Sequence, residues 1–226
     1  ARSVKKMEEQ ATELQKRYGI TATVIAADLE SNDGATKLYT DVKNRGIVLS
    51  ALANNAGYGV FGEFKDLALE PQLNMMALNI KALVVLTKLF LPDLLLSKGH
   101  IINTASIAAF QPDPYIAVYG ATKSFVLSFS EAIAAELENT GVRVTALCPG
   151  PTASGFVDKA DMHSSALFKG KKLPTSAEVA TKGYRAMKRG QRVYITGVMN
   201  RILAQSTRFG SRSLVTKIAK AMLKPV

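Results

Sequence analysis

Short apolar segments alternate with long helical patterns along most of this chain, and this alternation restricts its possible folds more than any other feature. Buried strands are predicted at residues 22–27, 47–53, 100–104, 142–148 and 192–196. Helices are predicted at residues 3–18, 33–44, 71–96, 119–139 and 177–189, the last preceded by a capping-box pattern at Thr175 and Glu178. Strands that alternate with helices form a parallel sheet with helices on both faces. The sequence therefore predicts a doubly wound α/β fold.

Length and apolar content predict a single domain over residues 1–226, because no linker or repeat interrupts the pattern. The longest apolar stretch, residues 82–96, contains Lys88, Pro92 and Asp93, so it falls short of the ~20 apolar residues of a membrane-spanning helix. The N-terminus has no apolar signal peptide, and the single Cys148 cannot form an internal disulfide. We therefore expect a cytoplasmic protein. With two histidines and one cysteine, no metal site is expected.

Positive charge is concentrated near the C-terminus. The net charge is +11, and no acidic residue follows Glu178, whereas the last 48 residues carry 11 lysines and arginines. Residues 200–226 are predicted to form a basic amphipathic tail with a break at Gly210. Such a tail suits a phosphate-bearing cofactor, an acyl carrier or an anionic membrane surface, and a solvated face is equally compatible. Few aromatic residues accompany the charge, so no nucleic acid partner is expected.

Two segments carry candidate functional side chains. Residues 54–57, Asn-Asn-Ala-Gly, follow the strand at 47–53, at the sheet edge where open α/β folds bind ligands. Ser106 follows the strand at 100–104, and Lys123 comes four residues after Tyr119, on the same helix face. A lysine cation beside the tyrosine would favour the phenolate, and Ser106 could hold a carbonyl or hydroxyl oxygen while Tyr119 exchanges its proton. Alone, this tyrosine–lysine spacing would more often be a surface pair.

A third segment, residues 148–152 with the sequence Cys-Pro-Gly-Pro-Thr, follows the strand at 142–148. Its two prolines stiffen the chain, and Gly150 is expected to allow an unusual backbone angle. Such a loop suits a flat ring that lies against the backbone.

Together these segments resemble the short-chain dehydrogenase/reductase family from residue 28 to residue 196, in the family's order and spacing. The resemblance implies a Rossmann-type sheet and a catalytic tetrad of Asn79, Ser106, Tyr119 and Lys123, in which Asn79 supports a water-linked proton path to Lys123. It also implies a nicotinamide cofactor bound by Arg2, Asp28, Leu29, Asn55, Ala56, Gly57, Tyr119, Lys123, Pro149, Gly150 and Thr152. Asp28 would contact the adenine, although its position also suits a turn. Arg2 matches the place of a cation for the 2′-phosphate, so NADP(H) is favoured over NAD(H).

Residues 153–174 match the substrate lid of that family. The lid contains Phe156, Met162, Leu167 and Phe168, and an apolar lining suits a hydrophobic carbonyl compound. Tyr115 and Phe110 would add to the same wall or simply fill core or surface positions. The substrate residues expected from the resemblance are Ser106, Tyr115, Phe156 and Phe168.

The sequence departs from the family at its start. The family opens with a strand, a glycine-rich turn, a helix and a second strand, and this sequence begins where that second strand would end. In the family's strand order the two absent strands lie between the segment 22–27 and the strand at 47–53, so their loss would split the sheet. We expect the biological protein to be longer, which an intact mass of 24.3 kDa would contradict.

The resemblance implies an NADP(H)-dependent enzyme that interconverts a carbonyl and a secondary alcohol on a small or medium hydrophobic substrate. Two alternatives are a carbonyl reductase for acyl chains or lipids, docked on a membrane by the basic tail, and a cofactor-binding regulatory member with little catalysis. The intact Ser106, Tyr119 and Lys123 argue against the regulatory alternative. Helices 71–96 and 119–139 resemble those that pair across the family's two-fold axis, so a homodimer or homotetramer is expected.

Overall fold

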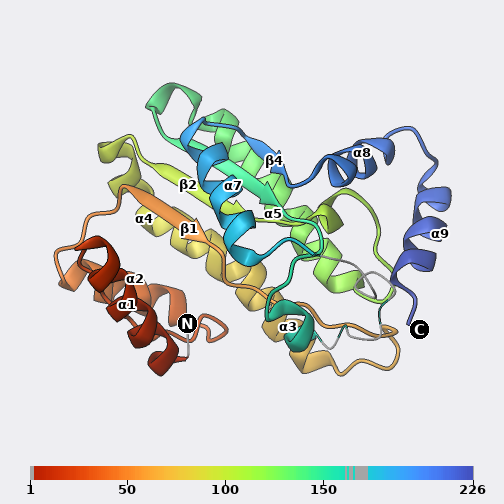
Figure 1. Ribbon diagram of the computed structural model, residues 1–226, viewed down its shortest axis with the longest axis horizontal. Coiled ribbons are helices and arrows are strands. Elements are labelled where there is room, and N and C mark those ends of the chain that lie inside the picture. The colour runs from red at the N-terminus through yellow and green to blue at the C-terminus, as the bar shows by residue number, and fades with distance from the viewer. Residues whose placement is uncertain (1–2, 161, 163–164, 166–172, 226) are drawn as a thin grey trace.

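The computed structural model of the protein describes residues 3–160, 162, 165 and 173–225 (Figure 1). Its strands are β1 Ala51–Asn54, β2 His100–Thr104, β3 Arg143–Cys148 and β4 Val193–Ile195. Its α-helices are α1 Val4–Tyr18, α2 Gly34–Asn44, α3 Leu69–Met76, α4 Leu83–Ser97, α5 Ala117–Glu136, α6 Phe156–Ala160, α7 Ser176–Lys188, α8 Val198–Ser206 and α9 Arg212–Leu223. A π-helical segment, η1 Ala77–Ala82, joins α3 to α4, and two 3₁₀ turns are η2 Ile107–Phe110 and η3 Glu138–Thr140.

The four strands form one parallel sheet in the order β1-β2-β3-β4. Ile101 in β2 lies opposite Leu52 in β1 and Val144 in β3, and Ala146 in β3 lies opposite Val193 in β4. Helices α4 and α5 pack on one face of this sheet and α7 packs on the other (Figure 1). The predicted α/β arrangement is confirmed. Because the strands are parallel, all their carboxyl ends meet at one edge of the sheet, where the functional segments follow them.

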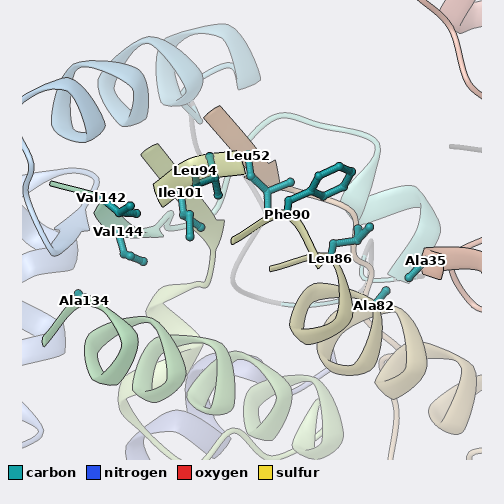
Figure 2. Close-up of a cluster of buried hydrophobic side chains, with 10 residues drawn as sticks. All are labelled: Ala35, Leu52, Ala82, Leu86, Phe90, Leu94, Ile101, Ala134, Val142 and Val144. Carbon is teal, nitrogen blue, oxygen red and sulfur yellow. The ribbon is translucent and has the colours of Figure 1, made fainter. Parts of the chain in front are cut away.

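One cluster of the core lies between α4 and the strands (Figure 2). Leu86, Phe90 and Leu94 recur every four residues along α4, so they share the face that packs toward Leu52 and Ile101. The Tyr39 ring of α2 meets Phe90 edge to face at a centroid distance of 5.1 Å. Burying each large apolar side chain stabilises the fold by roughly 1.5–3 kcal/mol, which explains why the α4 pattern determines the placement of this helix.

The predicted strand at 22–27 is wrong. This apolar segment is present, but it belongs to no sheet, and α1 before it has no buried residue. A strand is stable only when a neighbouring strand pairs with it, and no described segment pairs with residues 22–27. The strand predicted at 47–53 is also shorter, since the Leu49 N–H donates to the Asp93 carboxylate at 3.2 Å and takes no part in the ladder.

The long helix predicted at 71–96 contains the π-helical segment η1, which the apolar spacing did not indicate. The capping box at α7 is confirmed, with Thr175 and Glu178 each bonded to the other's backbone N–H. The basic tail forms two helices, α8 and α9, with the predicted break at Gly210. None of the helices in the described part of the chain has the length and apolar content that crossing a bilayer requires.

Candidate active site

A cavity of about 540 Å³ lies at the carboxyl ends of β1, β2 and β3. Nine of the residues proposed from the sequence line it, namely Asn55, Gly57, Ser106, Tyr119, Lys123, Pro149, Gly150, Thr152 and Phe156. The three segments that carried the candidate residues thus meet in space, as expected from a parallel sheet.

Tyr119 lies in the first turn of α5, and its buried side chain forms part of the cavity wall. The side chain of Ser106 lies close enough to its hydroxyl group to influence its pKa. Burial raises the pKa of Tyr119 to about 12, and the charge of Asp113 acts in the same direction, whereas Ser106 acts against both. At neutral pH Tyr119 therefore keeps its proton, as a proton donor to a carbonyl oxygen must.

Lys123 lies one turn further along α5 and is also buried. Its Nζ donates a hydrogen bond of 2.7 Å to the carbonyl oxygen of Thr104 and lies 5.6 Å from the centre of the Tyr119 ring. Burial lowers the pKa of Lys123 to about 8. The sequence suggested that this lysine cation would favour the phenolate form of Tyr119. The cation does lie near the ring, but it does not offset the rise in the Tyr119 pKa that burial causes.

Ser106 is held in an extended conformation at the start of η2. Its Oγ accepts a hydrogen bond of 3.1 Å from the N–H of Ala108, and the next residue, Ile107, donates its N–H to the carbonyl oxygen of Pro149 at 3.0 Å. These bonds fix the loop after β2 against the loop after β3. The Ser106 hydroxyl therefore has a defined position beside Tyr119.

Asn79 supports the site from behind the cavity wall and does not line the cavity itself. In the π-helical segment η1, its Oδ1 accepts from the N–H of Tyr58 at 3.2 Å, and its Nδ2 donates to the Tyr58 carbonyl and to Thr122 Oγ1, each at 3.0 Å. A Cβ on Gly57 would lie 2.8 Å from Asn79 Oδ1 and 3.5 Å from Lys123 Nζ. Only glycine therefore fits at position 57. The predicted proton path from Asn79 to Lys123 stays a prediction.

The loop after β3 is held by residues that follow β4. The N–H of Gly150 donates to Thr196 Oγ1 at 3.3 Å, and Thr152 Oγ1 donates to the carbonyl of Gly150 at 2.8 Å. The expectation of an unusual backbone angle at Gly150 is wrong, because its φ lies outside the left-handed region. Space is the reason for glycine here, since a Cβ would collide with the Asn200 side chain of α8. Cys148, just before the loop, is fully buried, and this burial raises its pKa to about 12.

Three residues proposed to bind the cofactor, Asp28, Leu29 and Ala56, do not line the cavity. Asp28 is exposed at a turn, where its Oδ1 accepts from the N–H of Glu30 at 3.2 Å and its carbonyl accepts from Ser31 Oγ at 2.8 Å. Leu29 packs on the core beside α4, and Ala56 is exposed in the loop after β1. Arg2 lies outside the described residues. Their roles in cofactor binding stay predictions.

The segment predicted to be a substrate lid contributes two described apolar residues, Phe156 and Met162, to the cavity. The ring of Phe156 lies 5.2 Å from that of Tyr119, centre to centre, and the buried Met162 lines the same space. Leu167 and Phe168 fall outside the described part of the chain. Phe156 therefore forms part of the cavity wall next to Tyr119.

Tyr115 and Phe110, proposed for the same wall, do not line this cavity. Tyr115 has a φ of 69°, an uncommon angle for a non-glycine residue, and its ring lies 6.2 Å from that of Phe61. The N–H of Gly62 donates to the Tyr115 carbonyl at 2.8 Å, which holds this turn in place. Phe110 lines a neighbouring cavity along the start of α5.

Two parts of the cavity wall were missed from the sequence. Val179 of α7 and Met222 and Leu223 of α9 line the side facing the C-terminal helices. Their helical spacing predicts an apolar face, but it does not say which part of the protein that face covers.

Asp113 is the second missed feature. It lines the cavity, is buried, and accepts a hydrogen bond of 3.0 Å from Gln111 Nε2 at its Oδ1. Its other oxygen has no hydrogen-bond partner among the described residues. Burial raises the pKa of Asp113 to about 7, against the effect of the Gln111 bond, so this carboxyl group titrates near neutrality.

Comparison with known proteins identifies the family. The family model described as short chain dehydrogenase matches residues 1–164. An uncharacterized oxidoreductase of Staphylococcus epidermidis is 30% identical over 155 residues, which cover 68% of this chain and 67% of that protein. The very-long-chain 3-oxoacyl-CoA reductase of Homo sapiens is 31% identical over 156 residues, covering 66% of this chain and 49% of that enzyme. The chain thus spans about half the length of the human relative.

Solved structures give the same result for the fold. A short-chain dehydrogenase from Sphingobium yanoikuyae in complex with NADPH aligns with a TM-score of 0.80 at 25% identity, over 92% of this chain and 82% of that one. A 7beta-hydroxysteroid dehydrogenase aligns with a TM-score of 0.82 at 20% identity, over 96% of this chain and 84% of that one, which bears on the fold alone. The chain therefore belongs to the short-chain dehydrogenase family, whose members are nicotinamide-dependent oxidoreductases of alcohols and carbonyls.

Proposed function

We propose that this chain reduces a small or medium hydrophobic carbonyl compound with NADPH and catalyses the reverse oxidation of the secondary alcohol with NADP⁺. The observation that carries the proposal is the meeting of Ser106 and Tyr119 in the wall of a largely apolar cavity, with Lys123 one turn away. The family's chemistry and the reductase and dehydrogenase names of the relatives agree with this class of reaction.

The residues at the carboxyl ends of the strands fit the nicotinamide end of the cofactor. The missing side chain at Gly57 leaves room beside Lys123, and Thr152 lines the same cavity as Pro149 and Gly150. In this proposal Lys123 holds the ribose hydroxyls and the Pro149–Thr152 loop holds the nicotinamide. When bound, the cofactor supplies or accepts the hydride. A glycine-rich turn for the pyrophosphate is not among the described residues.

The protein's own task in the reduction is to hold an oxygen and deliver a proton. Ser106 would hold the carbonyl oxygen by a hydrogen bond, and Tyr119 would donate its phenolic proton to it. A pKa of about 12 keeps that proton on Tyr119 until negative charge develops on the substrate oxygen. The Lys123 cation, 5.6 Å from the ring centre, would stabilise the phenolate that remains.

A preference for NADP(H) belongs to the same proposal. Arg2 matches the position of a cation for the 2′-phosphate, and the Sphingobium structure contains NADPH. A 3-oxoacyl-[acyl-carrier protein] reductase from Brucella melitensis with the same fold contains NAD. The ratio of kcat/KM for NADPH over NADH measures the preference, and Arg2→Glu should lower this ratio at least about ten-fold because a carboxylate repels the phosphate.

Assembly into a homodimer or homotetramer through the long helices belongs to the same proposal. Leu73 and Met76 of α3 and Phe125 of α5 are exposed apolar side chains on those helices. Analytical ultracentrifugation measures the mass in solution, and a monomer at micromolar concentration would contradict the assembly.

The reaction is tested by following NADPH absorbance with a panel of hydrophobic ketones, aldehydes and 3-oxoacyl thioesters. Turnover of at least one apolar carbonyl compound, with loss of turnover for small polar ones, is the expected result because the cavity is lined mainly by apolar groups. Tight NADPH binding without turnover of any compound would contradict the proposed enzyme and favour a regulatory protein.

A further inference from the structure

The two C-terminal helices expose several large apolar side chains. Together with the connection between them they form the C-terminal hairpin, residues 198–223, at the end of the molecule opposite α1 and α2 (Figure 1). By helical spacing Val198, Met199, Ile202 and Leu203 share one side of α8, and all four are exposed, with Val198 at 77%. Ala204, on the other side, is buried. The apolar side of α8 is therefore turned away from the protein.

Large apolar side chains are also exposed in the connection and along α9. Phe209, between the helices, is 91% exposed. Leu214, Ile218 and Met222 recur every four residues on α9 and are also exposed, whereas Ala219 and Leu223 face the body and are buried. Large apolar surfaces of this kind mark an interaction site.

Positive charge accompanies these apolar residues. The hairpin and the residue after it carry six cations and no acidic residue, namely Arg201, Arg208, Arg212, Lys217, Lys220 and Lys224. Among the ion pairs formed by the described residues, none involves one of these six. By helical spacing Lys217 lies beside the Leu214–Ile218–Met222 stripe of α9 and Lys220 lies on the opposite side of the helix, while Lys224 follows the end of the helix. A partner must therefore offer both apolar groups and negative charge.

We propose that the C-terminal hairpin binds the surface of an anionic lipid membrane. An amphipathic helix with large apolar residues on one side and basic residues on its polar sides lies in the interface between headgroups and acyl chains. A second copy of the chain fits less well. A two-fold contact places a surface against itself, so the six cations of one copy would oppose the six of the other.

The same hairpin closes one side of the catalytic cavity. Met222 and Leu223 line the cavity, and Met222 also belongs to the exposed stripe. A membrane bound along α9 therefore lies next to the cavity wall, and a ketone dissolved in the lipid reaches Tyr119 past Met222. This route rests on the proposed function, whereas membrane binding does not.

Binding is measured by sedimentation of the full chain with vesicles, without substrate or cofactor. Vesicles of phosphatidylcholine with about one third phosphatidylserine should bind the protein, and pure phosphatidylcholine vesicles should bind far less. Salt at about 0.5 M should weaken the binding. Equal binding to both kinds of vesicle, or none to either, would overturn the proposal.

Two variants with the same loss of charge locate the binding surface. The change Lys217→Gln/Lys220→Gln/Lys224→Gln should lower vesicle affinity on the order of 100-fold, at about five-fold for each cation. The control Lys5→Gln/Lys6→Gln/Lys16→Gln removes three exposed cations from α1, at the other end of the molecule, and should change affinity little. Equal losses in both variants would show an effect of net charge alone and overturn the proposal.

A third variant tests the apolar contact. Val198→Ser/Ile202→Ser keeps every charge but should release the protein from anionic vesicles at lower salt than the unchanged chain does. If the unchanged chain is instead an oligomer that this variant dissociates, the hairpin is a subunit interface and the proposal is wrong.

The substrate route is measured last. Anionic vesicles should speed the reduction of a membrane-dissolved ketone several-fold relative to phosphatidylcholine vesicles and leave that of a water-soluble ketone unchanged. Equal rates in the two kinds of vesicle would overturn the route alone. If neither ketone is reduced, the proposed function fails, while the sedimentation result stands.

Discussion

Lys123 Nζ donates a hydrogen bond of 2.7 Å to the main-chain carbonyl oxygen of Thr104. The side chain of Thr104 in turn donates to Asn55 Oδ1 at 2.9 Å. These two bonds connect α5, the end of β2 and the loop after β1. The position of the lysine is therefore fixed by the sheet edge as well as by its own helix, so the amino group is held beside Tyr119 at little further entropic cost.

Tyr119→Phe should lower kcat by ~10²–10⁴-fold and leave the affinity for NADPH nearly unchanged, because only the proton donor is lost. Tyr115→Phe is the matched control, because Tyr115 does not line the cavity. The kcat of this variant should change little. Steady-state kinetics and NADPH fluorescence titration measure the two quantities. Similar losses in both variants would contradict the assignment of Tyr119 as the donor.

The rate of reduction should decline as the pH rises above about 8. Burial lowers the pKa of Lys123 to about 8, so above this pH the amino group loses the charge that stabilises the phenolate. Arginine stays charged over this pH range, so the Lys123→Arg variant should not show the decline. The variant should be slower at every pH, because the larger guanidinium group fits the lysine site poorly. The profile of kcat/KM against pH measures the effect. A decline near the same pH in Lys123→Arg would show that another group titrates.

Asn79→Ala should lower the free energy of unfolding by ~2–4 kcal/mol, because it removes three buried hydrogen bonds to Tyr58 and Thr122. Asn32→Ala removes one exposed bond to Lys81 and should cost less than about 0.5 kcal/mol. Urea unfolding at equilibrium measures both. A loss below about 1 kcal/mol for Asn79→Ala would mean that these bonds do not hold the loop after β1 against α5.

Asp113→Asn should stabilise the protein at pH 8 but hardly at all near pH 4. Burial raises the pKa of Asp113 from 3.8 to about 7, so between these values the folded state binds more protons than the unfolded state. Stability is therefore lost as the pH rises from about 4 to about 7, and the amide avoids this loss. Thermal unfolding at the two pH values should show a gain of roughly 1–3 kcal/mol at pH 8 only. An equal gain in stability at pH 4 and pH 8 would contradict the titration of Asp113 near pH 7.

The chemistry-bearing segments were predictable because each follows a strand directly. Ser106 comes two residues after β2, and the Pro149–Thr152 loop begins where β3 ends, so parallel pairing alone brings them together. Tyr119 and Lys123 needed only the four-residue spacing of a helix. Local pattern and sheet topology together thus determine this part of the site.

The remaining features depend on contacts that local pattern does not contain. The segment 22–27 has the composition of a strand, but pairing is a property of two segments, and it has no partner in this sheet. Met222 and Leu223 show only that α9 has an apolar face, and their contact with a cavity whose other residues lie far away in the sequence is tertiary. The raised pKa of Asp113 likewise comes from burial by distant side chains.

The rate of chemical labelling at Cys148 can report opening of the loops around the site. It is the only cysteine of the chain, lies at the end of β3 with no exposed surface, and keeps its thiol protonated because burial raises its pKa to about 12. A maleimide can reach this sulfur only while the loops around the strand ends are apart. The labelling rate of the native protein, compared with that of a free thiol, therefore reports the equilibrium between closed and open forms of this region. A ligand that binds the closed form must slow the labelling in proportion to its occupancy, whatever its chemical identity.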